Sequence, residues 1–540
     1  MQGDPAKGHL GRAPAGALRD ARGAGAFALA SRSQWRRGMF ARVTSAAVVG
    51  IEAAPIDVQV DVGVGLPCCN IVGLADAGIR EGRLRIRGAL DNSGFKLPPR
   101  RITVNLAPAD LRKDGAAFDV PIAAGMLAAA GVVDAAALDG TLFIGELTLD
   151  GALRPVRGVL PIAAWARGRG IRRLVVPPDN AAEAAIVGGH EVHAPADLNG
   201  LVALLRGETP AAPATVALPP VRPPAAAMDL ADVRGQEVPR RALEIAAAGG
   251  HNLLFVGPPG AGKTMLAQRL PGILPPLNFD EALETTMVYS TAGLLGGSGL
   301  VAARPIRAPH HTVSAPGLIG GGPTVRPGEI SLAHNGVLFL DELLEFPRSV
   351  LEMLRQPLEE RAVTIVRVRR GVTYPADFML IAALNPCPCG HLGSTVRTCV
   401  CSAAAVMAYR SRLSGPLLDR IDLHVDVPAL PYRELAHAEP GESSSAIRDR
   451  VMAARGRQQA RGPRWNARLS SSDLRRVAPL DGAGHALLER AAVRLGLSAR
   501  AITRVRRVAR TIADLAGSPA IAATHLAEAI QYRVLDQPTT

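Results

Sequence analysis

An apolar run leads directly into the pattern G-x-x-x-x-G-K-T in the stretch Asn252-Leu253-Leu254-Phe255-Val256-Gly257-Pro258-Pro259-Gly260-Ala261-Gly262-Lys263-Thr264. This stretch decides the fold around it. Glycines in such a loop let successive backbone N–H groups point inward around phosphates, Lys263 reaches the terminal phosphates, and the Thr264 hydroxyl ligates Mg²⁺. A helix is expected from Met265 to Leu270, and its N-terminus favours anions. The order of strand, loop and helix predicts a nucleoside triphosphate site over residues 257–264 and argues against a chance glycine-rich turn.

Two later apolar runs end in polar side chains that a phosphate site needs. The run from Val337 to Leu340 precedes Asp341 and Glu342 and has the form of a Walker B element, in which Asp341 holds the Mg²⁺ shell and Glu342 polarises the attacking water. The alternative is a core strand that ends in surface acids, but a position roughly 80 residues after the phosphate loop favours Walker B. The run from Phe378 to Leu384 ends at Asn385, whose amide is expected to orient water beside the γ-phosphate.

Composition limits the size and setting of the protein. A chain of 540 residues is too long for one core and is expected to hold about three domains. No apolar run reaches transmembrane length, which predicts a soluble protein without a membrane partner. The 61 basic and 48 acidic residues leave a net charge of +13, which suits an anionic partner such as nucleic acid without identifying it. Six cysteines in so long a chain, four of them clustered, fit a reducing cytoplasm better than a disulfide framework.

Composition also predicts the domain boundaries. Residues 1–38 are rich in Ala, Gly and Arg and lack the apolar centre of a signal peptide, so they are interpreted as disordered or untranslated, with Met39 as a second start. Residues 39–206 alternate strand-like and helix-like runs, which indicates an α/β domain. Residues 207–227 are a Pro/Ala-rich linker. Residues 228–431 form the nucleotide-binding core, and 432–540 have a helical period that predicts a C-terminal lid.

With these three strand-end signals the chain resembles the AAA+ ATPases. Residues 232–236 look like the box that lies near the adenine in that superfamily, and Asn385 looks like sensor 1. The segment 414–422 resembles the finger segment of the magnesium-chelatase ATPase subunit, which assigns Arg420 to the neighbouring subunit's γ-phosphate, while Arg500 looks like sensor 2. For both arginines the alternative is an ordinary surface residue, and Arg412 and Arg504 are close competitors. A finger acting in trans requires a ring, and the family implies a homo-hexamer.

Three further segments bring the match closer, to the magnesium-chelatase-like ComM/YifB family, over residues 39 to about 535: Arg304 to His311, Gly328 to Gly336, and Pro98 to Leu111. The resemblance implies an ATP-driven DNA motor that promotes branch migration in homologous recombination and natural transformation. It also implies a Lon-protease-like (S5-like) α/β domain before the AAA+ core. Lon-type peptidases use a Ser nucleophile activated by Lys, and here Ala117 and Leu160 occupy those positions, so we do not expect proteolysis.

A basic segment before Asn385 is the candidate DNA contact. Residues 360–374 alternate apolar and basic side chains and are predicted to form a β-hairpin that turns near Gly371. In the resembling AAA+ clade this hairpin points into the ring pore, so Arg367, Arg369 and Arg370 are candidates to track phosphates of single-stranded or branched DNA. The alternative is a solvated hairpin face, because no aromatic stacking residue is interleaved.

Four cysteines form the candidate metal site. Cys387, Cys389, Cys399 and Cys401 offer four thiolates to a structural Zn²⁺, although the spacing is C-x-C twice where the usual knuckle has C-x₂-C. Reduced thiols without a metal are the alternative. The vicinal pair Cys68 and Cys69 is predicted to be buried as small residues.

Three other functions compete with a DNA motor. A true magnesium-chelatase subunit would need partner subunits and does not explain the Lon-like domain. A protein-remodelling chaperone is the main alternative. Stimulation of ATP hydrolysis by DNA or by protein would discriminate the motor from the chaperone. A nucleotide-gated scaffold is disfavoured because Lys263, Thr264, Asp341 and Glu342 are all present.

Overall fold

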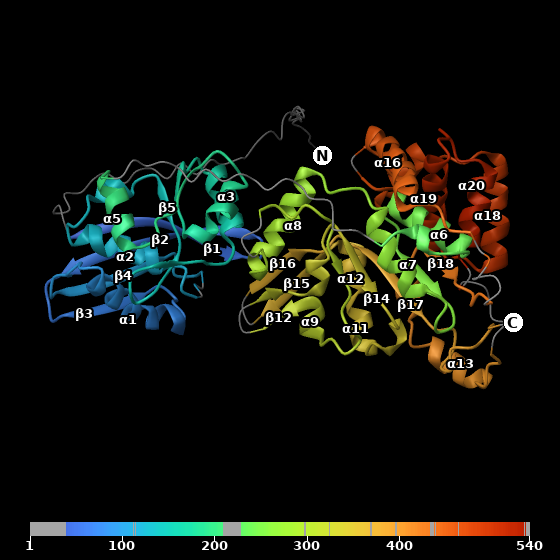
Figure 1. Cartoon of the computed structure of the whole chain (residues 1–540), viewed down its shortest axis with the longest axis horizontal. Helices are drawn as coiled ribbons and strands as arrows, with labels where there is room; N and C mark the ends of the chain where they lie inside the picture. The colour runs from blue at the N-terminus through green and yellow to red at the C-terminus, as the bar shows by residue number, and fades with distance from the viewer. Residues whose placement is uncertain are drawn as a thin grey trace, which may run out of the picture. The chain divides into compact units, whose positions relative to one another are not determined.

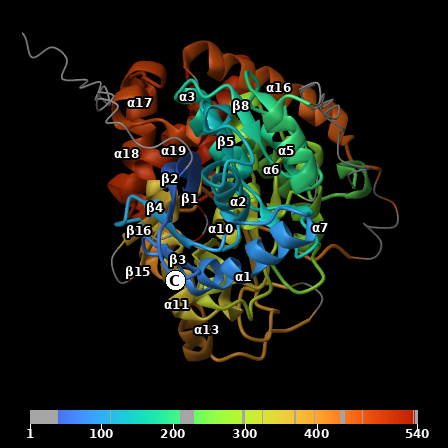
Figure 2. The same ribbon diagram turned by 90° about the vertical axis from the view of Figure 1, so that its left-hand side faces the viewer.

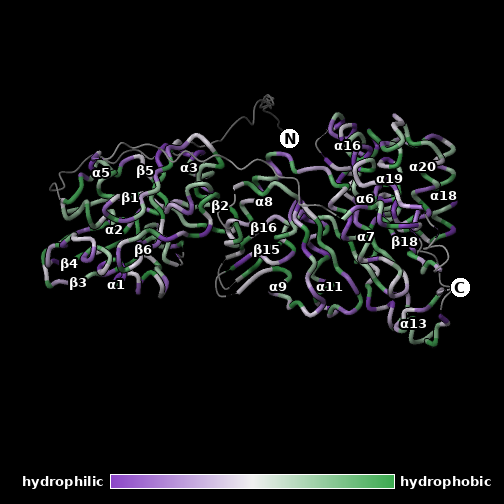
Figure 3. The backbone as a smooth tube through the Cα atoms, viewed as in Figure 1, coloured by the Kyte–Doolittle hydropathy of each residue, from purple (hydrophilic) through white to green (hydrophobic). Residues whose placement is uncertain are grey.

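The computed structural model describes residues 39–208 and 228–535, apart from Arg112, Asp114, 296–298, 323–324, 368–369, 395–396, 432–436, 438, Pro463 and Val534. The predictions for residues 1–38 and for nearly all of the linker over 207–227 therefore lie outside the described residues. In the described part of the chain, no helix is long and apolar enough to cross a membrane, and hydrophilic and hydrophobic residues are interleaved along the helices (Figure 3).

An α/β domain built on a seven-stranded sheet occupies residues 40–206 (Figure 1). The strand order is β3-β4-β2-β1-β5-β8-β9, where β1 to β5 are Phe40–Val49, Glu52–Gly63, Cys68–Val72, Arg101–Ala107 and Thr141–Phe143, β8 is Arg173–Val175 and β9 is Glu191–His193. The short strands β6 (Glu146–Leu147) and β7 (Leu153–Arg154) pair separately. The helices are α1 (Ala77–Asn92), α2 (Asp119–Ala129), α3 (Val159–Gly168), α4 (Ala181–Ala185) and α5 (Leu198–Arg206).

Period-two burial explains why this first sheet forms. In β2 the side chains of Ile56, Val58 and Val60 are fully buried while the residues between them are not, as the alternating sequence predicts. Helix α2 packs closely on this face because Gly125 has no side chain: a Cβ there would lie 2.7 Å from Val60 Cγ2. The strands and helices of this domain agree with the alternating pattern that its sequence shows.

A five-stranded parallel sheet forms the centre of the nucleotide-binding region, with the order β11-β14-β17-β10-β18. These strands are Ile306–Arg307 (β11), Val337–Leu340 (β14), Met379–Leu384 (β17), Leu253–Val256 (β10) and Leu423–Asp426 (β18). Every residue of β10, β14 and β17 is buried, which is the pattern of a parallel sheet covered on both faces. The three apolar runs singled out in the sequence are therefore neighbouring strands of one sheet.

Helices and short strands surround this sheet. The helices are α6 (Glu237–Gly249), α7 (Lys263–Arg269), α8 (Phe279–Ala292), α9 (Ala315–Ile319), α10 (Glu329–Leu332), α11 (Arg348–Met353), α12 (Arg355–Glu360), α13 (Ala403–Arg410) and α14 (Gly415–Leu418). Short strands β12 (Gly320–Gly321) and β13 (Arg326–Pro327) form one ribbon, and β15 (Ala362–Arg367) and β16 (Arg370–Pro375) form another.

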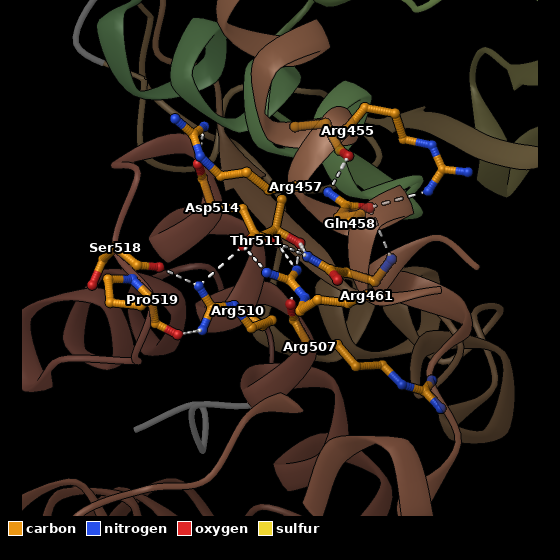
Figure 4. Close-up of polar contacts among 12 residues, drawn as sticks. Arg455, Arg457, Gln458, Arg461, Arg507, Arg510, Thr511, Asp514, Ser518 and Pro519 are labelled. Carbon is orange, nitrogen blue, oxygen red and sulfur yellow. Dashed lines mark hydrogen bonds and ion pairs between the residues drawn. The ribbon is translucent and has the colours of Figure 1, made fainter. Parts of the chain in front are cut away.

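The C-terminal region is helical, as its sequence predicts. Its helices are α16 (Ser444–Arg461), α17 (Ser471–Val477), α18 (Gly482–Leu495), α19 (Ala499–Leu515) and α20 (Ala523–Gln531). Helices α16 and α19 pack against α6 (Figure 1), and Figure 2 shows the same helical region, coloured orange to red, in a view turned by 90°. The buried carboxylate of Asp514 in α19 joins them: it accepts two hydrogen bonds from Arg461 of α16, at 2.7 and 2.5 Å, and one from Arg510 at 3.0 Å (Figure 4). Bidentate pairing of this kind fixes the angle between the two helices.

Candidate active site

Parallel pairing brings the three strand ends to one edge of the sheet. Val256 is paired with Leu384, and Leu340 with Ala382, so the loops after β10, β14 and β17 start side by side. In open parallel sheets, ligands bind at the carboxyl ends of the strands. The phosphate loop, the carboxylates after β14 and Asn385 therefore share one site.

Lys263 is the centre of this site. Its Nζ donates hydrogen bonds to the backbone oxygens of Gly257 at 2.7 Å and Pro258 at 2.9 Å, and to Asn385 Oδ1 at 3.1 Å. Burial lowers the pKa of the ammonium, and the charges of Asp341 and Glu342 oppose that shift. The contact with Asn385 joins the phosphate loop to the end of β17, as the two sequence motifs predict for one shared site.

The phosphate loop needs its glycines for two different reasons. Gly257 allows the loop to pass close to the residue after β18, because a Cβ there would lie 2.2 Å from the backbone oxygen of Val427. Gly260 and Gly262 have φ of +78° and +91°, the left-handed region that favours glycine, and a Cβ at Gly260 would meet nothing within 4 Å. The loop is thus held tightly at its start and is open where phosphate oxygens would approach.

The Mg²⁺ donors lie together. Thr264 Oγ1 donates to Asp341 Oδ2 at 2.5 Å, which joins the first turn of α7 to the end of β14. Hydroxyl and carboxylate oxygens are the ligands that Mg²⁺ prefers, so these two residues fit the ion. The backbone N–H of Glu342 donates to Asp341 Oδ1 at 2.9 Å, and Glu342 has a φ of 51°. Glu342 thus has a left-handed backbone directly after β14, a strained conformation typical of functional sites, and its side chain is 57% exposed.

His311 is a residue of the site that sequence reasoning did not single out. Its Nδ1 lies 3.6 Å from Glu342 Oε2, and its ring packs edge-on against Phe346 with the centroids 6.4 Å apart. His310 stacks beside it at 4.0 Å. The sequence signal that could have identified His311 is the His310-His311 pair, which lies in a segment that resembles the ComM/YifB family. These two histidines were assigned no role from the sequence alone. Gln236, in the segment likened to the adenine box, also contacts the site, because its Nε2 donates to Ala261 O at 3.3 Å.

Arg420 and Arg500 lie together at a different place. Arg420 is buried, pairs with Glu359 of α12, and donates to Pro416 O at 2.6 Å. Arg500 Nη2 lies 3.3 Å from the other carboxylate oxygen of Glu359, and its side chain is 59% exposed. These arginines are 80 residues apart in the sequence, yet both pair with the carboxylate of Glu359 in the folded chain. Neither hydrogen-bonds to the phosphate loop among the described residues.

The two competing arginines have other partners. Arg504 pairs with the buried carboxylate of Asp422 at 2.5 Å, and Arg412 lies 3.9 Å from Glu345. The positive charge of Arg504 is a main reason that the pKa of Asp422 is held far below its usual range, against the opposing effect of burial. Arg504 is therefore neutralised within its own chain, whereas Arg500 keeps most of its surface accessible.

The predicted basic hairpin is present, and its two strands close just before Gly371. Arg367 of β15 pairs with Arg370 of β16, and Gly371 pairs with Val366, so Gly371 is a strand residue and not the turn. The register is set by cross-strand pairs such as Ile365 with Val372. Arg369 lies outside the described residues, as do the side chains of Arg367 and Arg370.

The structure brings the cysteine cluster together and corrects one cysteine prediction. The sulfurs of Cys387, Cys389, Cys399 and Cys401 all lie within 4.8 Å of one another. Cys68, in contrast, is exposed and Cys69 is only half-buried, so the prediction that this pair is buried was wrong. The reason is that they start β3, an edge strand with a neighbour on one side only.

The positions that a Lon-type peptidase would use for catalysis are apolar here. Leu160 is fully buried in a hydrophobic cluster, and Ala117 packs against that cluster. Lys113, the nearby basic residue, is also buried, and its Nζ donates to Gly73 O at 3.1 Å and to Pro108 O. Nothing at these two positions can act as a nucleophile or as its base.

Comparison with known protein families agrees with this geometry. The model "Magnesium chelatase, subunit ChlI" matches residues 229–435, "Subunit ChlI of Mg-chelatase" matches 58–180, and "Magnesium chelatase, subunit ChlI C-terminal" matches 441–533. The parallel sheet, the phosphate loop, the Asp341-Glu342 pair and the helical C-terminal region define a magnesium-chelatase-like AAA+ ATPase, a class that uses ATP and Mg²⁺.

Similarity to individual proteins extends over nearly the whole chain. The chain is 44% identical to the YifB protein of Salmonella typhimurium, over 92% of this chain and 97% of that protein. It is 45% identical to the competence protein ComM of Haemophilus influenzae, over 91% of this chain and 97% of that protein. The chain belongs to the ComM/YifB family. The magnesium-chelatase 67 kDa subunit of Chlorobaculum parvum is 28% identical, over 29% of this chain and 23% of that protein.

Proposed function

We propose that this protein is a ring-shaped DNA motor that hydrolyses ATP and acts as a branch-migration helicase in homologous recombination and natural transformation. The observation that carries the proposal is the convergence of Lys263, Thr264, Asp341 and Asn385 at one sheet edge. That geometry supports ATP turnover. Similarity to a protein named for competence supports a role with DNA.

Each residue of the site has a separate task in the proposed hydrolysis. Lys263 would exchange its hydrogen bonds to Gly257 and Pro258 for the terminal phosphates, and Thr264 and Asp341 would hold Mg²⁺, which neutralises phosphate charge when bound. Glu342 accepts a proton from the attacking water, and Asn385 orients that water. The exposure of Glu342 leaves room for water beside its carboxylate.

The proposed ring requires Arg420 to exchange its contacts within its own chain for the neighbouring nucleotide. Its hydrogen bonds go to Glu359 and Pro416, so it does not serve the phosphate loop of its own chain in the described contacts. In the proposed hexamer Arg420 stabilises developing charge on the nucleotide of the neighbouring subunit, as arginine fingers do. Arg500 shares Glu359 with Arg420 and would reach the same interface.

The proposed DNA contact is the β15–β16 hairpin. It directly precedes β17, the strand that ends at Asn385, so a shift of that strand would be passed to the hairpin through a short connection. Arg367, Arg369 and Arg370 are close together in its sequence, and the chain has a net charge of +13. Contacts of arginine with phosphates alone predict binding that does not depend on sequence and that weakens as salt rises.

The test is the rate of ATP hydrolysis without DNA and with duplex, single-stranded or branched DNA. The Glu342→Gln variant serves as the blank, because it keeps the size of the side chain but removes the base; it should bind ATP and DNA and lose about 10²- to 10⁴-fold in rate. Lys263→Ala should lose nucleotide binding itself. Glu345→Gln is the matched control, since Glu345 is a nearby acid whose only described ion pair is a weak 3.9 Å contact with Arg412.

Stimulation by branched or single-stranded DNA would support the motor and lead to a branch-migration assay. An active ATPase that responds to no DNA would refute it and favour a protein-remodelling ATPase. Normal turnover in Glu342→Gln would refute the assignment of the catalytic base.

A further inference from the structure

We infer that Cys387, Cys389, Cys399 and Cys401 bind one structural Zn²⁺ ion, and that this ion holds the loop after β17 against the phosphate loop. The inferred site is separate from the Mg²⁺ donors Thr264 and Asp341. The metal belongs to the thiophilic class, because all four donors are sulfur.

The distances between the sulfurs fit tetrahedral coordination. With Zn–S bonds of about 2.3 Å, the sulfurs of a tetrahedral site lie roughly 3.8 Å apart. The Cys387–Cys389, Cys389–Cys399 and Cys387–Cys399 pairs are 3.4, 3.6 and 3.7 Å apart. Disulfide-bonded sulfurs would be about 2.0 Å apart, and all four cysteines are free. The thiols therefore have the arrangement of a four-sulfur ion site.

Backbone N–H groups point at three of these sulfurs. Leu392 donates to Cys387 at 3.3 Å, Cys389 donates to Cys401 at 3.4 Å, and Cys401 donates to Cys399 at 3.4 Å. Such hydrogen bonds stabilise thiolates and orient them as ligands. Thus the loop supplies both the four ligands and the surrounding donors.

In its described residues, the loop that carries these cysteines has no secondary structure of its own to hold it in place. No described residue between the end of β17 at Leu384 and the start of α13 at Ala403 belongs to a helix or strand. Connections of this length without secondary structure are uncommon in compact domains. Cys387 is buried and the other three cysteines are half-buried, and a metal bound by all four would join the two ends of the loop.

The loop is packed on the ATP site. Gly390 has a φ of +81°, and a Cβ at this position would lie 2.6 Å from Pro259 Cδ and 3.9 Å from Asn385 Cγ. Pro259 belongs to the phosphate loop, and Asn385 accepts the hydrogen bond from Lys263. An ion that fixes the loop therefore also fixes the position of two elements of the site. This coupling rests on the proposed ATPase, whereas the zinc site itself does not.

The experiment measures metal content first. The full chain is purified without added metal and analysed by mass spectrometry for zinc, together with Cys387→Ser and Cys399→Ser. Cys68→Ser and Cys69→Ser are the matched controls, because these cysteines are also free and lie outside the cluster. We expect one zinc per chain in the wild type and the controls, and less than about a tenth of that in the cluster variants.

A second measurement does not depend on whether the variants fold. Wild-type protein grown with Co²⁺ should show the thiolate-to-cobalt charge-transfer band and the intense visible bands of tetrahedral cobalt. Absence of zinc and of these bands would overturn the metal site.

Nucleotide binding then tests the coupling. Removing zinc with a chelator and then restoring Mg²⁺ should weaken binding of a fluorescent ATP analogue by about tenfold, a usual size for coupling between two sites, and restoring zinc should recover it. Unchanged nucleotide affinity in zinc-free, folded protein would overturn the coupling and leave the site intact. A zinc protein with coupled nucleotide binding but no response to DNA would contradict only the proposed motor.

Discussion

Replacing Gly390 by alanine tests whether the cysteine loop supports the phosphate loop. The new Cβ would lie 2.6 Å from Pro259 Cδ and 3.1 Å from Pro259 Cγ. Carbon atoms in contact are separated by about 3.5–4.0 Å, so one of the two loops must move by roughly 1 Å. Because Pro259 lies between the glycines that surround the phosphates, that movement should disturb the nucleotide site.

Gly393→Ala is the matched control. Gly393 lies in the same loop and has a φ of +77°, close to the +81° of Gly390, but a Cβ there would meet nothing within 4 Å. Both variants carry the cost of a left-handed alanine, about 1–2 kcal/mol. Only Gly390→Ala adds overpacking, typically about 1–3 kcal/mol. The difference between the variants therefore isolates the contact with Pro259.

Affinity for a fluorescent ATP analogue is the assay, with the melting temperature measured in parallel. If the overpacking energy is expressed in nucleotide binding, Kd should rise about 5- to 150-fold in Gly390→Ala relative to Gly393→Ala. Both variants should lose similar stability from backbone strain. Equal affinities in the two variants would refute the view that the cysteine loop positions the phosphate loop.

Two further predictions concern buried charges. Arg504→Ala leaves the Asp422 carboxylate buried without its main cation and should lower the free energy of unfolding by about 3–5 kcal/mol in urea denaturation. Removing the exposed Arg500 should lower it by under about 1 kcal/mol. Similar losses in the two variants would contradict the structural role of Arg504. Burial raises the pKa of Asp119 to about 6 despite its pairing with Arg85, so its protonation stabilises the folded state at acid pH. This contribution to the free energy of unfolding is on the order of 3 kcal/mol; it is full below about pH 4 and is lost as the pH rises through 6. Asp119→Asn should remove this pH dependence in denaturation measured from pH 4 to 7. An unchanged pH profile in the variant would contradict the prediction.

Local sequence was sufficient for the sheet edge that carries the site. The runs 253–256, 337–340 and 379–384 are apolar at every position, which identifies strands covered on both faces. The residue after each run then lies at the carboxyl end of a parallel strand. The phosphate loop, Asp341 and Asn385 could be placed together for that reason, and their hydrogen bonds agree.

Several features needed the structure because they depend on neighbouring strands. The register of the β15–β16 hairpin, in which Arg367 pairs with Arg370, comes from the structure, whereas the sequence predicted only a turn near Gly371. Exposure of Cys68 follows from the edge position of β3, which its own residues do not reveal. A role for His311 beside Glu342 became visible only from their separation of 3.6 Å.

The sequence by itself determined the phosphate-binding loop, the strands beside it and the four-cysteine motif, because each depends on residues close together in the chain. Only the tertiary structure decided which carboxylate pairs with each of these arginines. Arg504 is held by Asp422, while Arg420 and Arg500 meet at Glu359, which is 61 residues from one and 141 from the other. Ion pairing depends on distance in space, and only the folded chain brings charges so far apart in sequence within a few ångströms.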